Sequence, residues 1–184
     1  MDEAELVQAM KQVAEYSTNL RTTSWLWGGL TADIYAGCFL RNHHDLDYLT
    51  LDLHNFIEPL TQQFQEDGWA VKRLSNGDLG IKKEEAKIHL GNVVLSREAQ
   101  WTHNGDLGSL FFPLEWLARQ PRKFFDLDVH VIAPEFQYVL LTHPELLDPT
   151  WKPREKDVLA KDRLKAILEG NNIHFAGLSN RIHT

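Results

Sequence analysis

The spacing of apolar residues along the chain predicts an alternation of helices and strands. Leu6, Met10 and Val13 recur at helical intervals, whereas the apolar positions between 45 and 53 alternate as in a half-buried strand. The predicted helices are 4–17, 30–36, 55–68, 114–119, 135–142 and 154–169, and the predicted strands are 22–27, 45–53, 69–75, 79–83, 86–95 and 128–133. After the first helix, the order strand–helix–strand–helix–strand–strand–strand indicates an α/β domain built on a mixed sheet.

Turn and cap residues mark several of these boundaries. Gly37 is a candidate C′ glycine that ends the helix predicted for 30–36. Asn55 and Glu58 have the spacing of a capping box, with Asn55 as N-cap of the next helix. Asn76-Gly77 is a hairpin signal between the strands predicted for 69–75 and 79–83.

Length and composition favour a single globular unit. Of 184 residues, 43% are hydrophobic and 10% aromatic, which is enough apolar surface for a core. We expect residues 1–105 to form the main core and residues 106–184 to complete a cleft in the same compact unit. The net charge of −7 disfavours general nucleic-acid binding, which depends on Lys and Arg that neutralise phosphates.

Cysteine content and the start of the chain indicate the cellular setting. Cys38 is the single cysteine, so no internal disulfide or thiolate zinc site can form, and its apolar neighbours predict a buried side chain. The acidic N-terminus lacks the apolar segment of a signal peptide. Since no apolar run approaches the roughly 20 residues of a membrane helix, we expect a cytoplasmic protein without a membrane partner.

Two carboxylates lie two residues apart at the start of the strand predicted for 45–53. Asp45 and Asp47 would point to the same face, where protonation or a cation must relieve their repulsion. Gly28-Gly29 precedes a predicted helix, and the N–H groups at a helix start suit a phosphate. Each motif alone is typical of solvated strand ends and ordinary turns. Their combination indicates a phosphoryl- or nucleotidyl-transfer site with Mg²⁺.

The segment from Trp27 to Asp47 resembles the signature of the nucleotidyltransferase superfamily, in particular its aminoglycoside 2″- and lincosamide nucleotidyltransferase group. That signature reads G-G-x-x-x-D-x-x-x-G-x-x-x-R-x-H-x-D-h-D, where h is apolar. The matching residues are Gly28, Gly29, Asp33, Gly37, Arg41, His43, Asp45 and Asp47. All eight fall in register without a gap, which makes the match specific.

The resemblance implies a fold and a reaction. The fold would be an α/β (α+β) mixed sheet that is largely antiparallel, with helices on one side and a small C-terminal helical and β extension. Asp45 and Asp47 would hold Mg²⁺ or Mn²⁺, and Gly28-Gly29 would hold the triphosphate of ATP or another NTP. The enzyme would transfer a nucleoside monophosphate to a hydroxyl of a small molecule of the aminoglycoside or lincosamide type. Its partners would be the NTP and this acceptor, with a homodimer left open.

Three further residues are implied as nucleotide ligands. Arg41 would contact phosphate or pair with Asp33, and His43 would orient a carboxylate or a metal-bound water. For both, a structural hydrogen bond that braces the turn is the alternative. Lys156 would reach the nucleotide phosphates from the start of the last helix. The alternative is that Lys156 lies on a solvated helix face and does not bind phosphate, with Asp157 paired to Lys161 on the same helix.

The third carboxylate of the group, carried on a later strand, has no counterpart here. His89 stands at the corresponding place and could act as the general base near neutral pH. A histidine does not bring the negative charge of a carboxylate. The alternative is therefore a catalytically weak or inactive protein that binds nucleotide or a protein partner, as in toxin–antitoxin pairs.

A second D-x-D, at Asp126 and Asp128, lacks the preceding glycine turn and is interpreted as a strand entrance. The alternative is a place in an acceptor cleft, where acidic groups would favour an amino-sugar cation. Four aromatic residues would either wall that cleft or belong to the core: Trp101, Phe111, Phe112 and Trp116.

Overall fold

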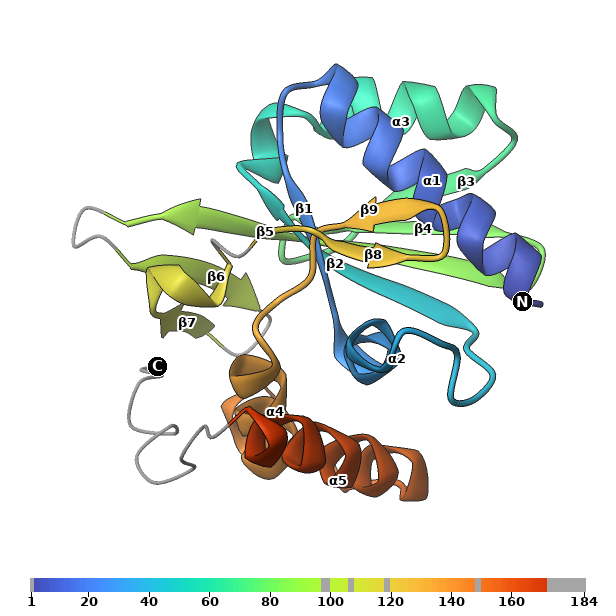
Figure 1. The fold of residues 1–184 in the computed structure, drawn as a ribbon. Coiled ribbons are helices and arrows are strands. Elements are labelled where there is room, and N and C mark those ends of the chain that lie inside the picture. The colour runs from blue at the N-terminus through green and yellow to red at the C-terminus, as the bar shows by residue number, and fades with distance from the viewer. Residues whose placement is uncertain (1, 97–99, 106–107, 118–119, 148–149, 172–184) are drawn as a thin grey trace.

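A seven-stranded mixed sheet forms the centre of the protein (Figure 1). The computed structural model describes residues 2–96, 100–105, 108–117, 120–147 and 150–171. The strands are β1 (Ser24–Trp27), β2 (Asp45–Leu51), β3 (Ala70–Arg73), β4 (Leu79–Lys83), β5 (Ala86–Leu95), β6 (Trp101–Gly105) and β7 (Gly108–Phe112). Five of them follow the order β1-β2-β5-β4-β3, while β6 pairs with β5 and β7 with β6. Only the β2–β5 pair among them is parallel, which confirms the predicted mixed sheet.

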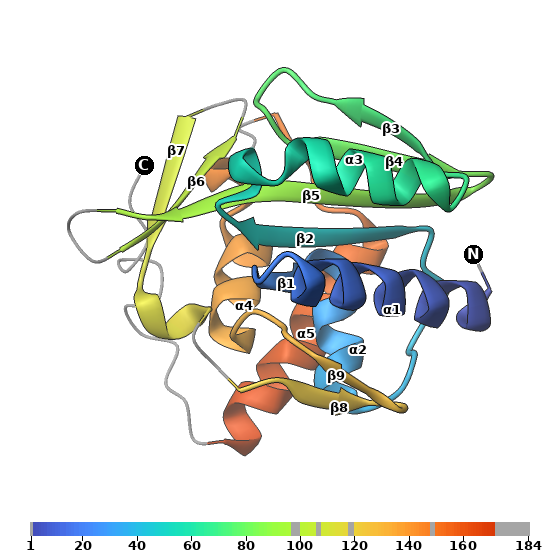
Figure 2. The ribbon, with the colours of Figure 1, turned by 90° about the horizontal axis from the view of Figure 1, so that it is seen from above.

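Helices cover both faces of this sheet (Figures 1 and 2). α1 (Glu3–Asn19) and α3 (Ile57–Glu66) lie on one face, and α2 (Thr31–Ala36), α4 (Pro134–Thr142) and α5 (Glu155–Gly170) lie on the other. Short 3₁₀ turns complete the connections: η1 (Gly28–Leu30), η2 (Leu53–Asn55), η3 (Leu114–Trp116) and η4 (Pro144–Leu146). The expectation of helices on one side only is therefore wrong. Both faces of the sheet carry apolar side chains, so both require a cover.

The first two helices lie within two residues of the predicted ranges 4–17 and 30–36. The carboxylate of Asp2 accepts a hydrogen bond from the Glu5 N–H, and the Glu5 side chain accepts from Asp2, so a capping box starts α1. Gly37 ends α2 in the left-handed conformation, with φ of 78°.

The capping box predicted for α3 is wrong. Asn55 ends the 3₁₀ turn η2, Phe56 occupies the N-cap position, and no side chain caps the helix. The cause lies in the preceding residues, because Asp52 adopts a left-handed conformation and Leu53 is fully buried. Burying Leu53 turns the chain tightly after β2, so the helix starts two residues beyond Asn55.

The strands after β5 differ most from expectation. β6 and β7 were not predicted, and they extend the sheet across the division expected at residues 105 and 106. The strand expected at 128–133 is shorter and belongs to a hairpin of β8 (Arg122–Phe124) and β9 (Leu127–Val129). The chain then runs beside β1, where the Leu26 N–H donates to the His130 carbonyl at 2.8 Å. Of the helix expected at 114–119, the described part is the turn η3, and residues 118–119 lie outside the described residues.

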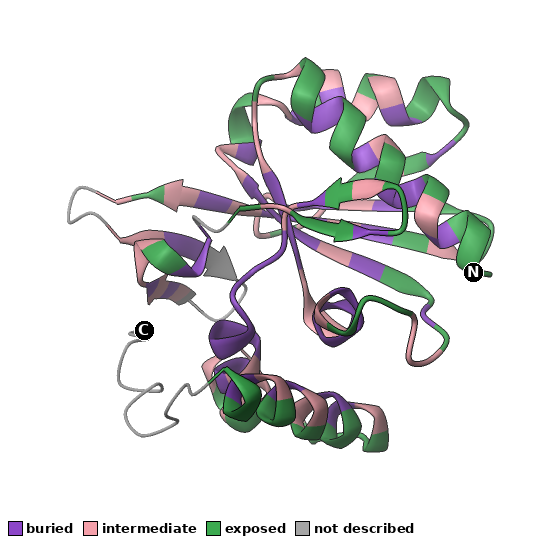
Figure 3. Cartoon of the chain, viewed as in Figure 1, coloured by how far each residue is buried: buried purple, intermediate pink, exposed green. Residues whose placement is uncertain are grey.

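Two apolar clusters hold these layers together (Figure 3). One joins the β-sheet to α1 and α3 and includes Leu46 and Tyr48 of β2. The other lies on the opposite face, where Leu49 packs with residues of β7 and α4. Cys38 belongs to neither and is exposed, contrary to expectation, because it follows the turn at Gly37. Among the described residues, no helix is long and apolar enough to cross a membrane.

Candidate active site

The register of the sheet brings three predicted site residues to one face. Asp47 of β2 lies opposite Trp27 of β1 on one side and opposite His89 of β5 on the other. Asp45 lies two residues before Asp47, and so shares its face. This face looks toward α4 and α5, because residues of both helices line a cleft together with Asp47.

The glycine pair begins η1 and α2, as predicted, and brings the backbone close to two charged side chains. Gly28 has φ of +75°, and a Cβ there would lie 2.7 Å from the Asp47 Oδ2. A Cβ on Gly29 would collide with the guanidinium of Arg41. The N–H of Gly28 donates to the side-chain oxygen of Gln137 at 2.7 Å. The positive φ of Gly28 favours glycine at that position, and α4 holds the turn in place through Gln137.

The electrostatics of the site centre on Asp47. Burial, followed by the charge of Asp45, raises the pKa of Asp47 to about 6, against an ordinary value of 3.8. The positive charges of His89, Lys156 and Arg154 lower it in part. Asp45 lies beside Asp47, whose pKa is raised, and a cation would neutralise the charge of this crowded pair.

The donor set fits a hard divalent cation that also binds phosphates. Asp45 and Asp47 supply carboxylate oxygens, the ligands that Mg²⁺ and Mn²⁺ accept together with substrate phosphates and water. Across the described residues, no group of three or more His, Cys, Asp or Glu side chains is arranged to hold a metal by itself.

Arg41 and His43 occupy different layers of the site. The Arg41 guanidinium lies over Gly29 and donates to the Asn42 carbonyl at 3.0 Å. His43 is 2% exposed, and its Nε2 lies 2.8 Å from the Asp33 Oδ2, which also accepts the Leu40 N–H. Arg41 is thus placed at the glycine turn, while His43 and Asp33 form a buried brace beneath it. For His43, this position fits the alternative interpretation of the sequence, in which a structural hydrogen bond braces the turn.

The start of α5 carries a cluster of opposite charges. Arg154 donates to both carboxylate oxygens of Asp157, at 2.8 and 3.1 Å, and its guanidinium lies 5.6 Å from the centre of the Trp151 ring. Asp157 thus pairs with Arg154 rather than with Lys161. Lys156 is half-buried beside this pair, and its charge acts on Asp47.

His89 makes a contact that the sequence did not indicate. Its Nε2 lies 3.1 Å from the Oδ2 of Asp78, and its Nδ1 lies 3.8 Å from the Oδ1 of Asp47. The Asp78 side chain is completely buried. The only sequence signal at this position was the Asn76-Gly77 turn, which predicts a hairpin but not that the next side chain points inward.

A cleft of about 260 Å³ opens beside Asp47, between the sheet and the C-terminal helices. The glycine turn and Asp47 form one side of it. Its other lining residues are Trp27, Gln137, Leu140, Leu141, Pro144, Leu147, Trp151, Arg154 and Asp157. Gln137 and Trp151 had no motif to mark them, since an isolated Gln or Trp in an apolar segment is also typical of a core.

The second D-x-D lies on the β8–β9 hairpin, away from this cleft. Asp126 pairs with Lys11 at 3.0 Å and Asp128 with Lys123 at 2.8 Å, in exposed contacts. The interpretation as a structural strand entrance fits these positions. Of the four aromatic residues considered for a cleft wall, Phe112 and Trp116 are fully buried in the core.

The fold is that of the nucleotidyltransferases, and solved structures of that class share it. The lincosamide antibiotic adenylyltransferase LnuA, with lincomycin bound, superposes with a TM-score of 0.68 and 20% identity, covering 91% of this chain and 98% of that one. ANT(2″)-Ia in complex with adenylyl-2″-tobramycin superposes with a TM-score of 0.70 and 14% identity, covering 96% of this chain and 95% of that one. An antigenic nucleotidyltransferase-like protein from Paracoccidioides brasiliensis superposes with a TM-score of 0.57 and 13% identity, covering 90% of this chain and 77% of that one.

These structures include the group that the Trp27–Asp47 signature resembles, so the nucleotidyltransferase-like mixed-sheet fold predicted from that resemblance is confirmed, although helices cover both faces of the sheet. By sequence alone, no family model matches the chain, and no curated protein does either.

Proposed function

We propose that the protein is a nucleotidyltransferase that moves a nucleoside monophosphate, with ATP as the expected donor, onto a hydroxyl of a small molecule. The observation that carries the proposal is that Asp47 contacts the glycine turn and lines a cleft, with Asp45 two residues before it and His89 opposite it on β5. A nucleotidyltransferase fold and a matching signature support it.

The residues of this chain have distinct roles in the proposed reaction. Asp45 and Asp47 would hold Mg²⁺ or Mn²⁺, which when bound neutralises charge on the carboxylates and the phosphates. Arg41 and Lys156 would offset the remaining charge of the triphosphate. Gln137 accepts the Gly28 N–H and so fixes the position of the glycine turn.

The bond changes are those of an in-line displacement. The acceptor oxygen forms a bond to the α-phosphorus of the NTP, and the bond from that phosphorus to the bridging oxygen breaks. Pyrophosphate leaves with the electron pair, and the hydroxyl proton passes to His89 as general base. The products are the nucleotidylated acceptor and pyrophosphate.

Acceptors of the aminoglycoside and lincosamide type are the first to test. The structures with similar folds bind lincomycin and adenylyl-2″-tobramycin. The acidic chain and the carboxylates at the cleft are compatible with a cationic amino-sugar.

Thermal unfolding with each of ATP, GTP, CTP and UTP, with and without Mg²⁺, tests the nucleotide half of the proposal. One nucleotide should raise the melting temperature only when the metal is present, and Asp45→Asn and Asp47→Asn should abolish that rise. Asp162→Asn, an equal change of charge on the outer side of α5, is the matched control. A rise that survives both site substitutions contradicts the proposed metal site.

Pyrophosphate release across a panel of aminoglycosides and lincosamides tests the transfer itself. A second function, binding without turnover, is favoured by one observation, which is the histidine at the place of the third carboxylate. The same panel of acceptors distinguishes nucleotidyl transfer from binding without turnover. Metal-dependent nucleotide binding without pyrophosphate release on any hydroxyl acceptor would support a nucleotide- or partner-binding protein of the toxin–antitoxin type.

A further inference from the structure

A buried carboxylate behind His89 is held from three sides. The Oδ1 of Asp78 accepts the N–H of Asn92 at 2.9 Å, and its Oδ2 accepts from the Asn76 side-chain amide at 2.8 Å. The same Oδ2 lies 3.1 Å from the His89 Nε2. Burial opposes ionisation of Asp78, but the hydrogen bonds from His89 and from the Asn92 N–H outweigh it and lower its pKa. Asp78 is therefore ionised at neutral pH.

An ionised carboxylate can only accept hydrogen bonds, so the Nε2 of His89 must carry the shared proton. In a neutral imidazole the other nitrogen then has the lone pair. That nitrogen, Nδ1, is on the side of Asp47, at 3.8 Å from its Oδ1, which is longer than a hydrogen bond. The ring thus turns its acceptor nitrogen toward the reacting groups and its donor nitrogen toward the interior.

We propose that Asp78 is a positioning residue that fixes His89 in the Nε2–H tautomer, so that Nδ1 receives the proton of the acceptor hydroxyl. This inference rests on the proposed function. As the hydroxyl oxygen bonds to phosphorus, its proton moves to Nδ1, and the positive charge of the imidazolium is balanced by Asp78. The proton then leaves to water. The pair of Asp78 and His89 supplies the charge that a lone histidine lacks at the position of the third carboxylate.

The tautomer of His89 can be observed directly. Long-range ¹H–¹⁵N spectra of the ¹⁵N-labelled protein, recorded well above the ordinary pKa of imidazole and assigned with His89→Gln, report which ring nitrogen carries the proton. We expect Nε2–H in the wild type. In Asp78→Asn the amide oxygen can still accept from Asn92 while its NH₂ group faces His89, so we expect Nδ1–H. Asp128→Asn, on the exposed hairpin, should leave the tautomer unchanged.

Protonation on Nδ1 in the wild type, or the same tautomer in wild type and Asp78→Asn, overturns the proposal. The wild-type spectrum is decisive by itself if Asp78→Asn does not fold. Because this measurement needs neither nucleotide nor acceptor, its failure is distinct from a failure of the proposed function.

A double-mutant cycle of kcat values distinguishes a positioning role of Asp78 from a purely structural one. Asp78→Asn should lower kcat for pyrophosphate release by about 100-fold, the scale of a general base. In a His89→Gln background, which has no ring tautomer to fix and adds no charge beside Asp78, the same substitution should lower kcat by far less than 100-fold. Equal losses in both backgrounds would overturn the positioning role. Absence of turnover in the wild type on every acceptor refutes the proposed function, and the spectra still decide whether Asp78 orients His89.

Discussion

Replacing Asp47 by asparagine should stabilise the ligand-free protein at neutral pH while it abolishes metal-dependent nucleotide binding. The pKa of Asp47 in the folded protein is about 6, against 3.8 for an ordinary Asp. The difference of about 2 pKa units corresponds to about 3 kcal/mol at most, at roughly 1.4 kcal/mol per unit. Because the side chain is 34% exposed, solvent screening reduces the expected gain to about 1 kcal/mol.

The dependence on pH has a defined sign. Between 3.8 and about 6 the folded protein binds more protons at Asp47 than the unfolded chain does. The contribution of Asp47 to the free energy of unfolding is therefore largest below this window and is lost as the pH rises through it. Asp47→Asn has no such group, so the difference between variant and wild type should grow with pH up to about 6 and then stay constant.

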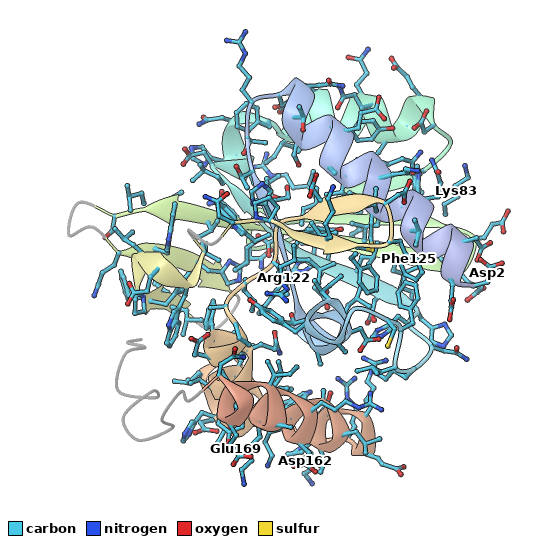
Figure 4. All side chains as sticks on the ribbon, viewed as in Figure 1. Asp2, Lys83, Arg122, Phe125, Asp162 and Glu169 are labelled. Atoms are coloured by element: carbon cyan, nitrogen blue, oxygen red, sulfur yellow. The ribbon has the colours of Figure 1, made fainter. Side chains whose placement is uncertain are left out.

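Urea unfolding of both proteins across this pH range, without metal or nucleotide, measures the effect. At neutral pH a gain of about 1 kcal/mol corresponds to a rise in melting temperature of about 2–4 °C for a chain of this size. Asp162, which is exposed on the outer side of α5 (Figure 4), provides the matched control, because Asp162→Asn removes an equal charge far from the cleft. A variant less stable than wild type at neutral pH, or a difference that does not vary with pH, would refute the proposed crowding of carboxylates.

Three other substitutions test the remaining residues of the candidate site. Gly28→Ala should lower the free energy of unfolding by about 1–3 kcal/mol, because φ of +75° and the contact with Asp47 disfavour a Cβ; urea unfolding measures the loss. Asp33→Ala should lower it by about 3 kcal/mol in the same assay, since the buried His43 ring and the partly buried Leu40 N–H lose their acceptor. Lys156→Ala should change stability by less than about 0.5 kcal/mol. It should weaken metal–nucleotide binding about tenfold in calorimetry, the scale of one charged contact. Unchanged affinity would remove Lys156 from the proposed site.

Local sequence spacing was sufficient for several segments in the first half of the molecule. The strand–turn–helix from β1 through α2, with Gly37 at its end, follows from side-chain periodicity and from the conformations that only glycine adopts readily. The same holds for the β3–β4 hairpin at Asn76-Gly77. In these segments the residues that decide the conformation are neighbours in the chain.

The second half was harder to predict for a physical reason. β6 and β7 acquire their hydrogen bonds from β5 and from each other, so their strand conformation depends on the sheet to which they add. In the first half, the start of α3 was displaced because burial of Leu53 outweighed the cap that Asn55 could have formed.

The sequence by itself determined that Asp45 and Asp47 share a face and that a glycine turn precedes them, because two-residue periodicity and glycine conformations are local properties. Only the tertiary structure decided which distant groups meet them. The parallel register of β2 and β5 set His89 beside Asp47, and the hairpin before β4 set Asp78 behind His89. Such contacts depend on how strands pair across the sheet, and strand pairing is fixed by burial of both faces together, which no single segment of the chain encodes.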